Sequence, residues 1–414
     1  MTGFFTKQET KIDNFSVKKR GFSCYSCGLY KNDINCPNPK MEPFGQFKKG
    51  IMNIGSFTSF QDDQLSKPFQ GSENYIYHVY NKLGIDIEKD CININAVRCF
   101  TYDKETGKSR IPTAKEISCC QLNIFRIIQQ YKPKLIVLFG KIALTSVIGS
   151  RWKKSLEGID KWRGFIIPDQ ELKCWIAPVF LPSFVQQSNR VEVANIFEKD
   201  LKNALAILDK EFPVYQEPTI NYITDLSVLE QIPNNAMIAF DYETTGLKPY
   251  AKSHKIVCCS VATDEDNVYV FTMPNEIEKR EPFINLLNNK YIKKFSHNMK
   301  FEETWSWVKL KTRVKSWYHD AMLAAHILDN RTGITNLKFQ TYVNFGIIDY
   351  SSTVEPYLQA IDEKNANSMN RLLEYFATPE GKKETLKYCA YDSINEYRLA
   401  MKQMKEFELL TLPF

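Results

Sequence analysis

No run of about 18 apolar residues occurs in the sequence, which excludes a helical membrane span. The first residues, Met1 to Lys11, also lack the apolar core and small-residue cleavage site of a secretory signal. The eleven cysteines are odd in number and irregularly spaced, which argues against a disulfide framework and fits a reducing compartment. We therefore expect a soluble, cytoplasmic protein.

The length and composition indicate more than one globular domain. A chain of 414 residues is too long for a single ordinary core, and 43% hydrophobic with 25% charged residues is typical of folded proteins. The segment Asp209 to Thr219 carries Pro213 and Pro218 after a long amphipathic pattern, which predicts a linker. The expected division is residues 1–212, a linker at 213–218, and residues 219–414.

Positive charge is concentrated at the amino-terminal end. The net charge is +6, and the first 50 residues hold nine Lys and Arg against four acids, so five of the six charges lie there. A polyanionic partner would be attracted to this end. A solvated tail with no special purpose is the alternative.

Two acids stand out in the second half of the chain. An apolar run from Ile238 leads into Asp241 and Glu243, and a strand places residues at this spacing on one face. Adjacent carboxylates repel each other unless a divalent cation lies between them, and their oxygens suit Mg²⁺ or Mn²⁺. For this segment alone, an exposed strand end finished by a turn is an equally good interpretation.

Two later segments favour the metal site. Tyr291 to Phe295 reads as a strand, and Asn298 and Glu302 follow it one helical turn apart. A helical pattern over Glu384–Met401 then carries Tyr388 and Asp392, again at i and i+4. The acids therefore recur at spacings that allow them to face one cleft.

These three segments resemble the three exonuclease motifs of the DEDD superfamily, in the tyrosine form carried by the proofreading domain of family A DNA polymerases. The resemblance covers Thr219 to Phe414. It implies a ribonuclease H-like α/β domain that removes nucleoside 5′-monophosphates from the 3′ ends of DNA. Single-stranded or frayed ends are the implied substrate, and two Mg²⁺ or Mn²⁺ ions are the implied cofactors.

The resemblance also implies roles for individual residues. Asp241, Glu243 and Asp392 would hold the first ion, Asp241 and Glu302 the second, and Tyr388 would orient the attacking water. The second motif usually ends in Asp, so the extra methylene of Glu302 is a departure. Tyrosine, with an ordinary pKa of about 10, is a poor base at neutral pH, and we expect activity to rise with pH.

Further residues of the second motif have expected roles. Glu303 would point about 100° away from Glu302 on a helix and is the weaker candidate ligand. Asp320 matches a recurrent acid of the family and is expected to support the site. Residues expected to contact the nucleic acid there are His297, Asn298 and Lys300.

The first half of the chain alternates strand and helix, which predicts an α/β domain with a mostly parallel sheet and a ligand site at the carboxyl ends of its strands. Strand-like runs occur at Gly50–Gly55, Asp90–Val97, Lys134–Gly140 and Trp175–Leu181, and helical patterns at Glu73–Leu83, Thr113–Tyr131 and Val191–Lys210.

Four cysteines of this half are spaced as metal ligands. Cys24 and Cys27 form a close pair, Cys99 follows an expected strand, and Cys120 lies on an expected helix. Four thiolates in this layout could hold zinc or an iron–sulfur cluster. Buried free thiols are the alternative.

This half resembles the uracil-DNA glycosylase superfamily, and in particular its 4Fe–4S-containing family 4, over roughly Gly21 to Leu208. The resemblance implies a 4Fe–4S cluster on Cys24, Cys27, Cys99 and Cys120, with Cys119 in the wrong register. An insertion, 102–109, lengthens the gap before Cys120. The matching pieces are Cys24–Leu29, Gly50–Gly55, Lys67–Gly71, Asn95–Cys99, Pro112–Cys120, Lys132–Gly140 and Trp162–Gly164.

The catalytic segments of that family are not preserved. The water-positioning acid that follows the first strand is replaced within Gly55–Ser59, and the catalytic histidine is replaced in Leu181-Pro-Ser-Phe184. A site without both groups loses its main electrostatic help for base excision. We therefore expect a DNA-binding or docking module, with Phe57 and Phe184 available to stack on a base; residual catalysis through Ser56 or Asp62 is the alternative.

The two resemblances together match the N-terminal portion of certain bacteriophage family A DNA polymerases. The chain ends at Phe414 without a polymerase domain, so the expected polymerase partner is a separate subunit or a missing part of the chain. The host cytoplasm of an infected bacterium is the implied location. Two other functions remain open: an active uracil-DNA glycosylase with an accessory nuclease, and a non-enzymatic DNA-binding adaptor.

Overall fold

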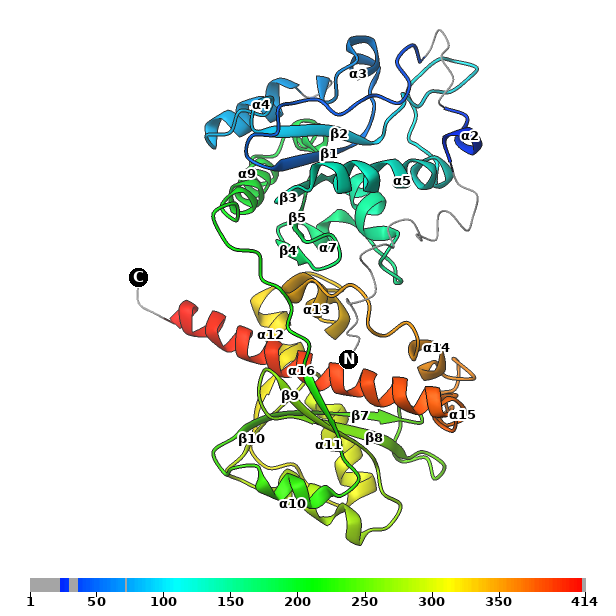
Figure 1. Cartoon of the computed structure of the whole chain (residues 1–414), viewed down its shortest axis with the longest axis vertical. Helices are drawn as coiled ribbons and strands as arrows, with labels where there is room; N and C mark the ends of the chain where they lie inside the picture. Colours follow the sequence, from blue (N-terminus) through cyan, green and yellow to red (C-terminus); the bar gives the residue numbers. More distant parts are fainter. Residues whose placement is uncertain (1–22, 30–35, 71–72, 412–414) are drawn as a thin grey trace. The chain divides into compact units, whose positions relative to one another are not determined.

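The computed structural model describes residues 23–29, 36–70 and 73–411. Of the basic region in the first 50 residues, residues 1–22 and 30–35 therefore lie outside the described residues. The chain divides into two compact units. Unit 1 comprises the chain up to Tyr215 together with Tyr342–Ile348, and unit 2 comprises Gln216–Thr341 and Asp349–Phe414 (Figure 1). Among the described helices, none is both long and apolar enough to cross a bilayer.

Unit 1 is built on a five-stranded sheet in the order β2-β1-β3-β5-β4. Its strands are β1 (Ile51–Phe57), β2 (Cys91–Val97), β3 (Leu135–Phe139), β4 (Ile167–Asp169) and β5 (Cys174–Val179). All pairings are parallel except that of β4 with β5. The four expected strands are confirmed to within two residues, whereas the antiparallel edge strand β4 was not anticipated because it is only three residues long.

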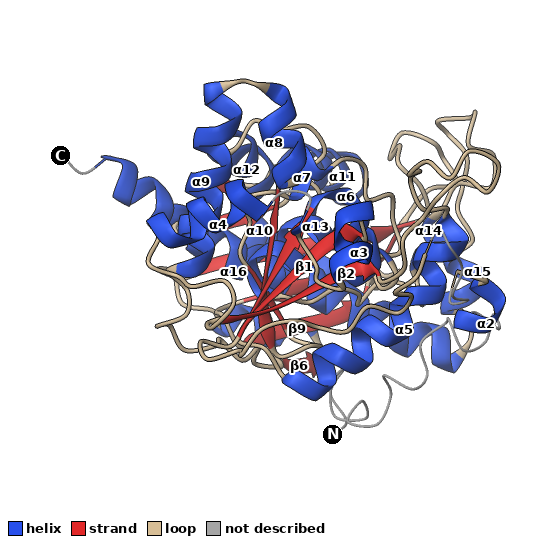
Figure 2. Ribbon diagram, turned by 90° about the horizontal axis from the view of Figure 1, so that it is seen from above, coloured by secondary structure: helices blue, strands red, loops and turns tan. Residues whose placement is uncertain are grey.

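Helices lie on both sides of β1 and β2 (Figure 2), which accounts for the complete burial of β2 and β3. The strand β3 is an uninterrupted apolar run, whereas β2 carries the buried polar residues Asn93 and Asn95. The long helices are α4 (Glu73–Lys82), α5 (Ala114–Tyr131) and α9 (Val191–Leu205), and the short ones are α2 (Cys24–Cys27), α3 (Phe60–Leu65), α6 (Gly140–Leu144), η3 (Thr145–Gly149), α7 (Ile159–Trp162) and α8 (Pro182–Ser188).

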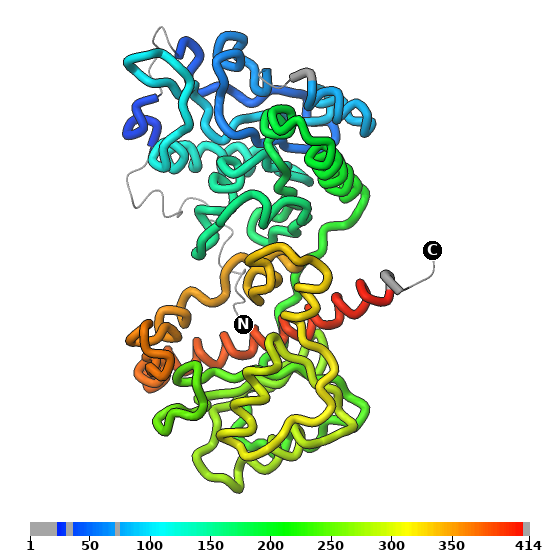
Figure 3. Tube along the Cα trace, turned by 180° about the vertical axis from the view of Figure 1, so that it is seen from behind, coloured from blue at the N-terminus to red at the C-terminus, as the bar shows by residue number. Residues whose placement is uncertain are grey.

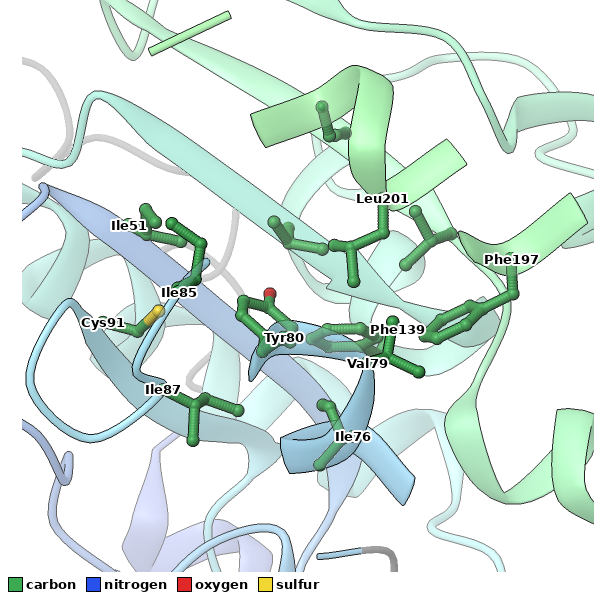
Figure 4. Close-up of a cluster of buried hydrophobic side chains, with 14 of the residues drawn as sticks. Ile51, Ile76, Val79, Tyr80, Ile85, Ile87, Cys91, Phe139, Phe197 and Leu201 are labelled. Carbon is green, nitrogen blue, oxygen red and sulfur yellow. The ribbon is translucent and has the colours of Figure 1, made fainter. Parts of the chain in front are cut away.

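The core of unit 1 lies between the sheet and two of these helices. Val79 and Tyr80 of α4 and Leu201 of α9 pack with Ile51 and Phe139 of the sheet (Figure 4). The helix α9 ends at Leu205, five residues before the expected end. The apolar faces of α4 and α9 therefore hold both helices against the same side of the sheet.

Unit 2 contains a six-stranded mixed sheet in the order β11-β10-β7-β8-β9-β6, in which β7, β8 and β9 pair antiparallel and the other pairings are parallel. Its strands are β6 (Thr219–Tyr222), β7 (Met237–Thr244), β8 (Ile256–Ala262), β9 (Asn267–Thr272), β10 (Lys293–Ser296) and β11 (Trp317–Asp320).

The 33-residue helix α16 (Pro379–Thr411) covers one face of this sheet, across β7, β8 and β9 (Figure 3). The helix α10 (Glu281–Asn288) covers the other face, where Phe283 packs on Phe240. The remaining helices are η4 (Leu226–Gln231), η5 (Glu278–Arg280), α11 (Met299–Trp305), η6 (Ser306–Leu310), α12 (Ala321–Leu328), α13 (Leu337–Phe345), α14 (Glu355–Leu358) and α15 (Leu372–Phe376). Both units are α/β, as expected.

A buried ion pair joins the segment Tyr342–Ile348 to the rest of unit 1. The guanidinium of Arg151 donates to Asp169 Oδ1 at 2.9 Å, and the Tyr342 hydroxyl donates to Asp169 Oδ2 at 2.7 Å. Gly346, at φ +76°, lies so close to the backbone of Pro168 that a Cβ atom would be 1.6 Å from its carbonyl oxygen. Glycine is therefore required where this segment meets the β4 edge.

We expect Asp169→Ala to lower the free energy of unfolding of unit 1 by about 3–5 kcal/mol, because it leaves the buried Arg151 charge without its main partner. Urea unfolding followed by circular dichroism measures this loss. The control is Glu42→Ala. This substitution removes the ion-pair partner of Arg98, and the Glu42 side chain is 83% exposed. That variant should lose less than about 1 kcal/mol, and equal losses in the two variants would contradict the interpretation.

Candidate active site

Strand β7 directs two acids to the face of the sheet that α16 covers. Ile238 and Phe240 belong to the apolar cluster on the α10 side, whereas Ala239 belongs to the cluster that α16 completes. Asp241 and Glu243 continue the Ala239 series at alternate positions. A carboxylate oxygen from each lies within 4.8 Å of the other and of Cys389 Sγ on α16. The two carboxylates therefore meet, as the spacing predicts.

Helix α16 supplies Tyr388, Asp392 and Glu396 at i, i+4 and i+8, on the same side of the helix. All three side chains are buried. The helix is held to the sheet at this point because Ser260 Oγ of β8 donates to the Cys389 carbonyl oxygen at 2.7 Å. One carboxylate oxygen of Glu396, Oε2, has no hydrogen-bond partner in the described structure.

Glu302 reaches the same cluster from α11. Its Oε2 accepts a hydrogen bond from Ser296 Oγ at 2.7 Å. The adjacent Glu303 instead accepts from Arg313 Nη1 and Trp317 Nε1, both at 3.1 Å, on another side of α11. Of the two neighbouring glutamates, the structure thus brings only Glu302 to the acids.

Asp320 shapes the turn that presents α11. Its carboxylate accepts from the backbone N–H groups of Asn298 and Met299, each at 3.1 Å, and also caps α12 through Met322 and Leu323. Asn298 has the left-handed φ of +78°, which favours Asn or Gly. Asp320 therefore supports the turn, while Asn298 begins the helix that carries Glu302.

Burial and mutual repulsion raise the pKa values of the clustered acids well above the usual range. For Asp241 the causes are burial and the charge of Asp392; for Glu302 they are burial and the charge of Asp241. The pKa values of Glu243 and Glu396 are raised in the same way, by burial and by the nearby carboxylates. These acids therefore hold their protons more tightly than exposed carboxyl groups do.

One lysine partly balances these acids. Lys338 Nζ of α13 forms an ion pair with Asp392 Oδ1, which also accepts from the Tyr350 hydroxyl at 2.7 Å. The same ammonium lies 4.3 Å from the ring centroid of Tyr388. Burial and the Asp392 charge raise the pKa of Tyr388 well above its usual value, so its hydroxyl stays protonated.

The chemistry of this donor set fits divalent cations. Five buried or half-buried carboxyl groups converge around one ammonium, and Glu396 contributes an oxygen without a partner. Hard oxygen ligands suit Mg²⁺ or Mn²⁺. Cys389 Sγ lies beside Asp241 and Glu243 and 3.3 Å from Ser260 Oγ, and burial raises the pKa of its thiol well above the usual value.

The expected nucleic acid contacts lie where β10 leads into α11. His297 and Asn298 connect the two elements, and Lys300 is in the first turn of α11. Lys300 is exposed, whereas His297 is half-buried. Burial lowers the pKa of His297 to about 4, so it is neutral at pH 7, and its Nδ1 has no hydrogen-bond partner among the described residues. His297 can therefore offer hydrogen bonding without adding positive charge.

The cysteines of unit 1 also gather at one place. Cys24 and Cys27 on α2 lie against α5, and the pKa of Cys120 is raised to about 12 by burial and by the charges of Cys99, Cys27 and Cys24. Cys119 Sγ lies 3.6 Å from Ser26 Oγ, so both neighbouring cysteines face this region. Among the described residues, no three of these sulfurs lie within 4.8 Å of one another. Four thiolates on one zinc, with Zn–S bonds of about 2.3 Å, would be closer together.

The polar side chains near the carboxyl end of β1 make structural contacts. Ser56 Oγ, near the end of β1, donates to the Phe139 carbonyl, and the buried Asp62 on α3 accepts from Ser59 N, Gln70 N and Asn95 Nδ2. The hydrogen bonds of Asp62 use both of its carboxylate oxygens. Phe57, the last residue of β1, is half-buried, and Phe184, on α8, is 47% exposed.

Sequence reasoning missed Glu396, Lys338 and Tyr350 in unit 2. Glu396 could have been found, because it continues the i, i+4 series of Tyr388 and Asp392 by one more turn. The other two gave no signal of this kind, since Lys338 lies 54 residues before its partner Asp392 in the chain.

Two family models match separate segments of the chain. Residues 42–206 match the uracil DNA glycosylase superfamily, and residues 220–408 match the 3′–5′ exonuclease family. The type-4 uracil-DNA glycosylase of Pyrobaculum aerophilum is 26% identical over 136 residues, which span 32% of this chain and 64% of that protein, less than two thirds of its length.

Two nucleases are among the solved structures that align with part of this chain. NrnC of Brucella melitensis aligns with 17% identity and a TM-score of 0.33, over 46% of this chain and 83% of its own. RNase D of Escherichia coli aligns with 16% identity and a TM-score of 0.34, over 47% of this chain and 46% of its own. The glycosylase superfamily and exonuclease family models match consecutive, separate segments of the chain, residues 42–206 and residues 220–408.

Proposed function

We propose that this protein is a metal-dependent 3′–5′ exonuclease that acts on DNA and proofreads for a bacteriophage family A DNA polymerase. The observation that carries the nuclease proposal is the convergence of Asp241, Glu243, Glu302 and Asp392, from three separate segments, beside Tyr388. The DNA substrate, the polymerase partner and the location in an infected bacterial cell rest on the resemblance of the sequence motifs.

The proposed mechanism assigns positioning roles to the acids. Asp241, Glu243 and Asp392 would hold one divalent ion, and Asp241 and Glu302 would hold the other. When bound, two such ions would stabilise the entering and the leaving oxygen of the phosphodiester and the charge that develops between them. Glu396 lies near Asp241, Glu302 and Asp392, and its charge would add to the negative potential that a cation offsets.

Two further residues act on the reacting groups. Tyr388 stays protonated, so it orients the attacking water by hydrogen bonding rather than by removing its proton. Lys338 pairs with Asp392, and its ammonium would be the positive group of the protein nearest to a phosphate held at these acids.

In unit 1 we propose a DNA-binding module that carries a 4Fe–4S cluster on Cys24, Cys27, Cys99 and Cys120 and does not excise uracil. The four cysteines gather where α2 lies against α5, and cysteine thiolates are the ligands of such clusters. At the positions that correspond to the catalytic segment of the glycosylase family, Ser56 near the end of β1 and Asp62 on α3 are both used in structural hydrogen bonds.

We expect Asp241→Ala to reduce shortening of a 5′-labelled single-stranded DNA by about 10³-fold or more, because both ion sites lose a shared ligand. Gel analysis with Mg²⁺ or Mn²⁺ should show a ladder from the 3′ end for the native protein and none with EDTA. Glu303→Ala, one position beyond Glu302, is the matched control and should remain active. An intact label with folded native protein would leave a DNA-binding adaptor as the better description, and faster shortening of RNA would reassign the substrate.

The raised pKa values predict that metal binding strengthens with pH. Protons held by Asp241, Glu243, Glu302 and Glu396 must leave before cations bind, so the rise in Tm caused by Mn²⁺ should grow as the pH rises above the ordinary carboxyl range of about 4 to 5. In EDTA the same acids should make the protein less stable as pH rises, because the folded state holds more protons than the unfolded state. Scanning calorimetry measures both trends. A metal-induced shift that stays constant as the pH rises would contradict the assignment, and Glu396→Gln should flatten the trend in EDTA.

For unit 1 we expect protein purified without oxygen to contain about four irons per chain and to absorb visible light. Cys99→Ser should lose most of the iron, whereas Cys174→Ser, at a buried cysteine on β5, should retain it. Metal analysis and absorption spectra decide the matter: one zinc per chain, or no metal, would overturn the cluster proposal.

A further inference from the structure

A groove of about 1140 Å³ lies at the edge of the unit 1 sheet where β1 and β3 begin. It is formed by the turn before β1, the end of α4 and the second half of α9 (Figure 1). The loops that resemble the glycosylase active site follow the carboxyl ends of β1 and β5. The groove is therefore at the opposite end of the strands and separate from that site.

Lysines dominate the walls of this groove. It contains six lysines and two acids, Glu198 and Asp209, so the lining carries a net charge of +4 (six minus two). The lysines, all exposed, are Lys48, Lys49, Lys82, Lys134, Lys199 and Lys202. Like charges gathered in a concave surface produce a focused positive potential that attracts anions.

Most of these charges are not neutralised by the protein. Lys49 pairs with Asp90 at 3.0 Å and Lys82 with Glu198 at 2.5 Å. The other four lysines are Lys48, Lys134, Lys199 and Lys202. Among residues 23–29, 36–70 and 73–411, no carboxylate lies within ion-pair distance of any of them. These unpaired ammonium groups come from three parts of the chain but line the same groove. A single extended anion in the groove can therefore contact all of them.

The floor of the groove is rigid. Ile85 lines it and packs in the buried cluster with Ile51 and Leu201, which holds α4 and α9 against the sheet (Figure 4). Lys199 and Lys202 are three residues apart on α9 and therefore project from one face of that helix. The positions of the charges are thus fixed by the core, while each lysine stem remains free to adjust.

The lining residues also indicate which anion fits. They include no aromatic ring on which an unpaired base could stack and no arginine that could read a base edge by two hydrogen bonds. Lysines act as point charges on phosphates and carry no sequence information. A duplex, which hides its bases and presents two phosphate chains, suits this surface better than a single strand does.

We propose that this groove binds the sugar–phosphate backbone of a double-stranded nucleic acid, independently of sequence. The choice of a nucleic acid over other polyanions rests on the proposed nuclease function. The groove would be a second binding site for the substrate, in addition to the proposed exonuclease site at Asp241, Glu243 and Asp392.

The test measures binding of the full chain to a short fluorescent duplex by anisotropy, in EDTA so that no cleavage occurs. Lys199→Gln/Lys202→Gln is compared with Lys104→Gln/Lys108→Gln, which removes two exposed lysines from a loop outside the groove. Removing two phosphate contacts should weaken duplex binding on the order of tenfold at about 100 mM salt and make the slope of log K against log salt shallower by about 1.8. The control pair should change affinity by less than about twofold, and binding of a single strand of equal length should change less than duplex binding.

Several results would overturn the proposal. Unchanged duplex affinity and salt slope in the groove variant, or equal losses in the two variants, would show that the groove makes no specific contribution. Equal displacement of the duplex by polyglutamate would assign the groove to an acidic protein instead. Because the assay requires no hydrolysis, its failure is distinguishable from failure of the exonuclease assay with Asp241→Ala.

Discussion

Repulsion among buried carboxyl groups is the constraint on which the organisation of unit 2 depends. Asp241 and Glu243 are fixed by strand alternation, and α16 adds Asp392 and Glu396 directly opposite them. Such a cluster is unfavourable by itself, since burial disfavours the charged form of every member. The repulsion among these carboxyl groups can be offset only by Lys338, by retained protons or by bound cations. The cluster therefore lowers local stability, and it favours any positive ion that binds there.

The surrounding structure keeps the acids from moving apart. Phe240 and Phe283 pack the back of β7 against α10, and the hydrogen bond from Ser260 to the Cys389 carbonyl fixes α16 in register on β8. The turn stabilised by Asp320 then sets where α11 begins and so where Glu302 points. Preorganisation of this kind lowers the cost of arranging ligands when ions and substrate arrive.

Much of this arrangement could be predicted because it depends on local periodicity. The alternation of β7 and the four-residue spacing of Tyr388 and Asp392 reveal which side chains share a face, and the alternating elements of unit 1 reveal its sheet. Contacts between distant segments, such as Lys338 with Asp392 or Tyr342 with Asp169, leave no periodic pattern in a single sequence. The three-residue strand β4 was missed for a related reason, since its length is too short to show any period.

The participation of Tyr342–Ile348 in unit 1 has a consequence for how the chain folds during synthesis. More than a hundred residues separate Asp169 from Tyr342, and all of the intervening chain except the first part belongs to unit 2. On the ribosome, unit 1 can form its sheet early, but the buried Asp169 must wait for its tyrosine partner until much of unit 2 has emerged. Until then, that edge of the sheet is exposed to solvent or covered by a chaperone. A chain whose synthesis ended after Tyr215 would lack Tyr342 and leave this edge without its partner.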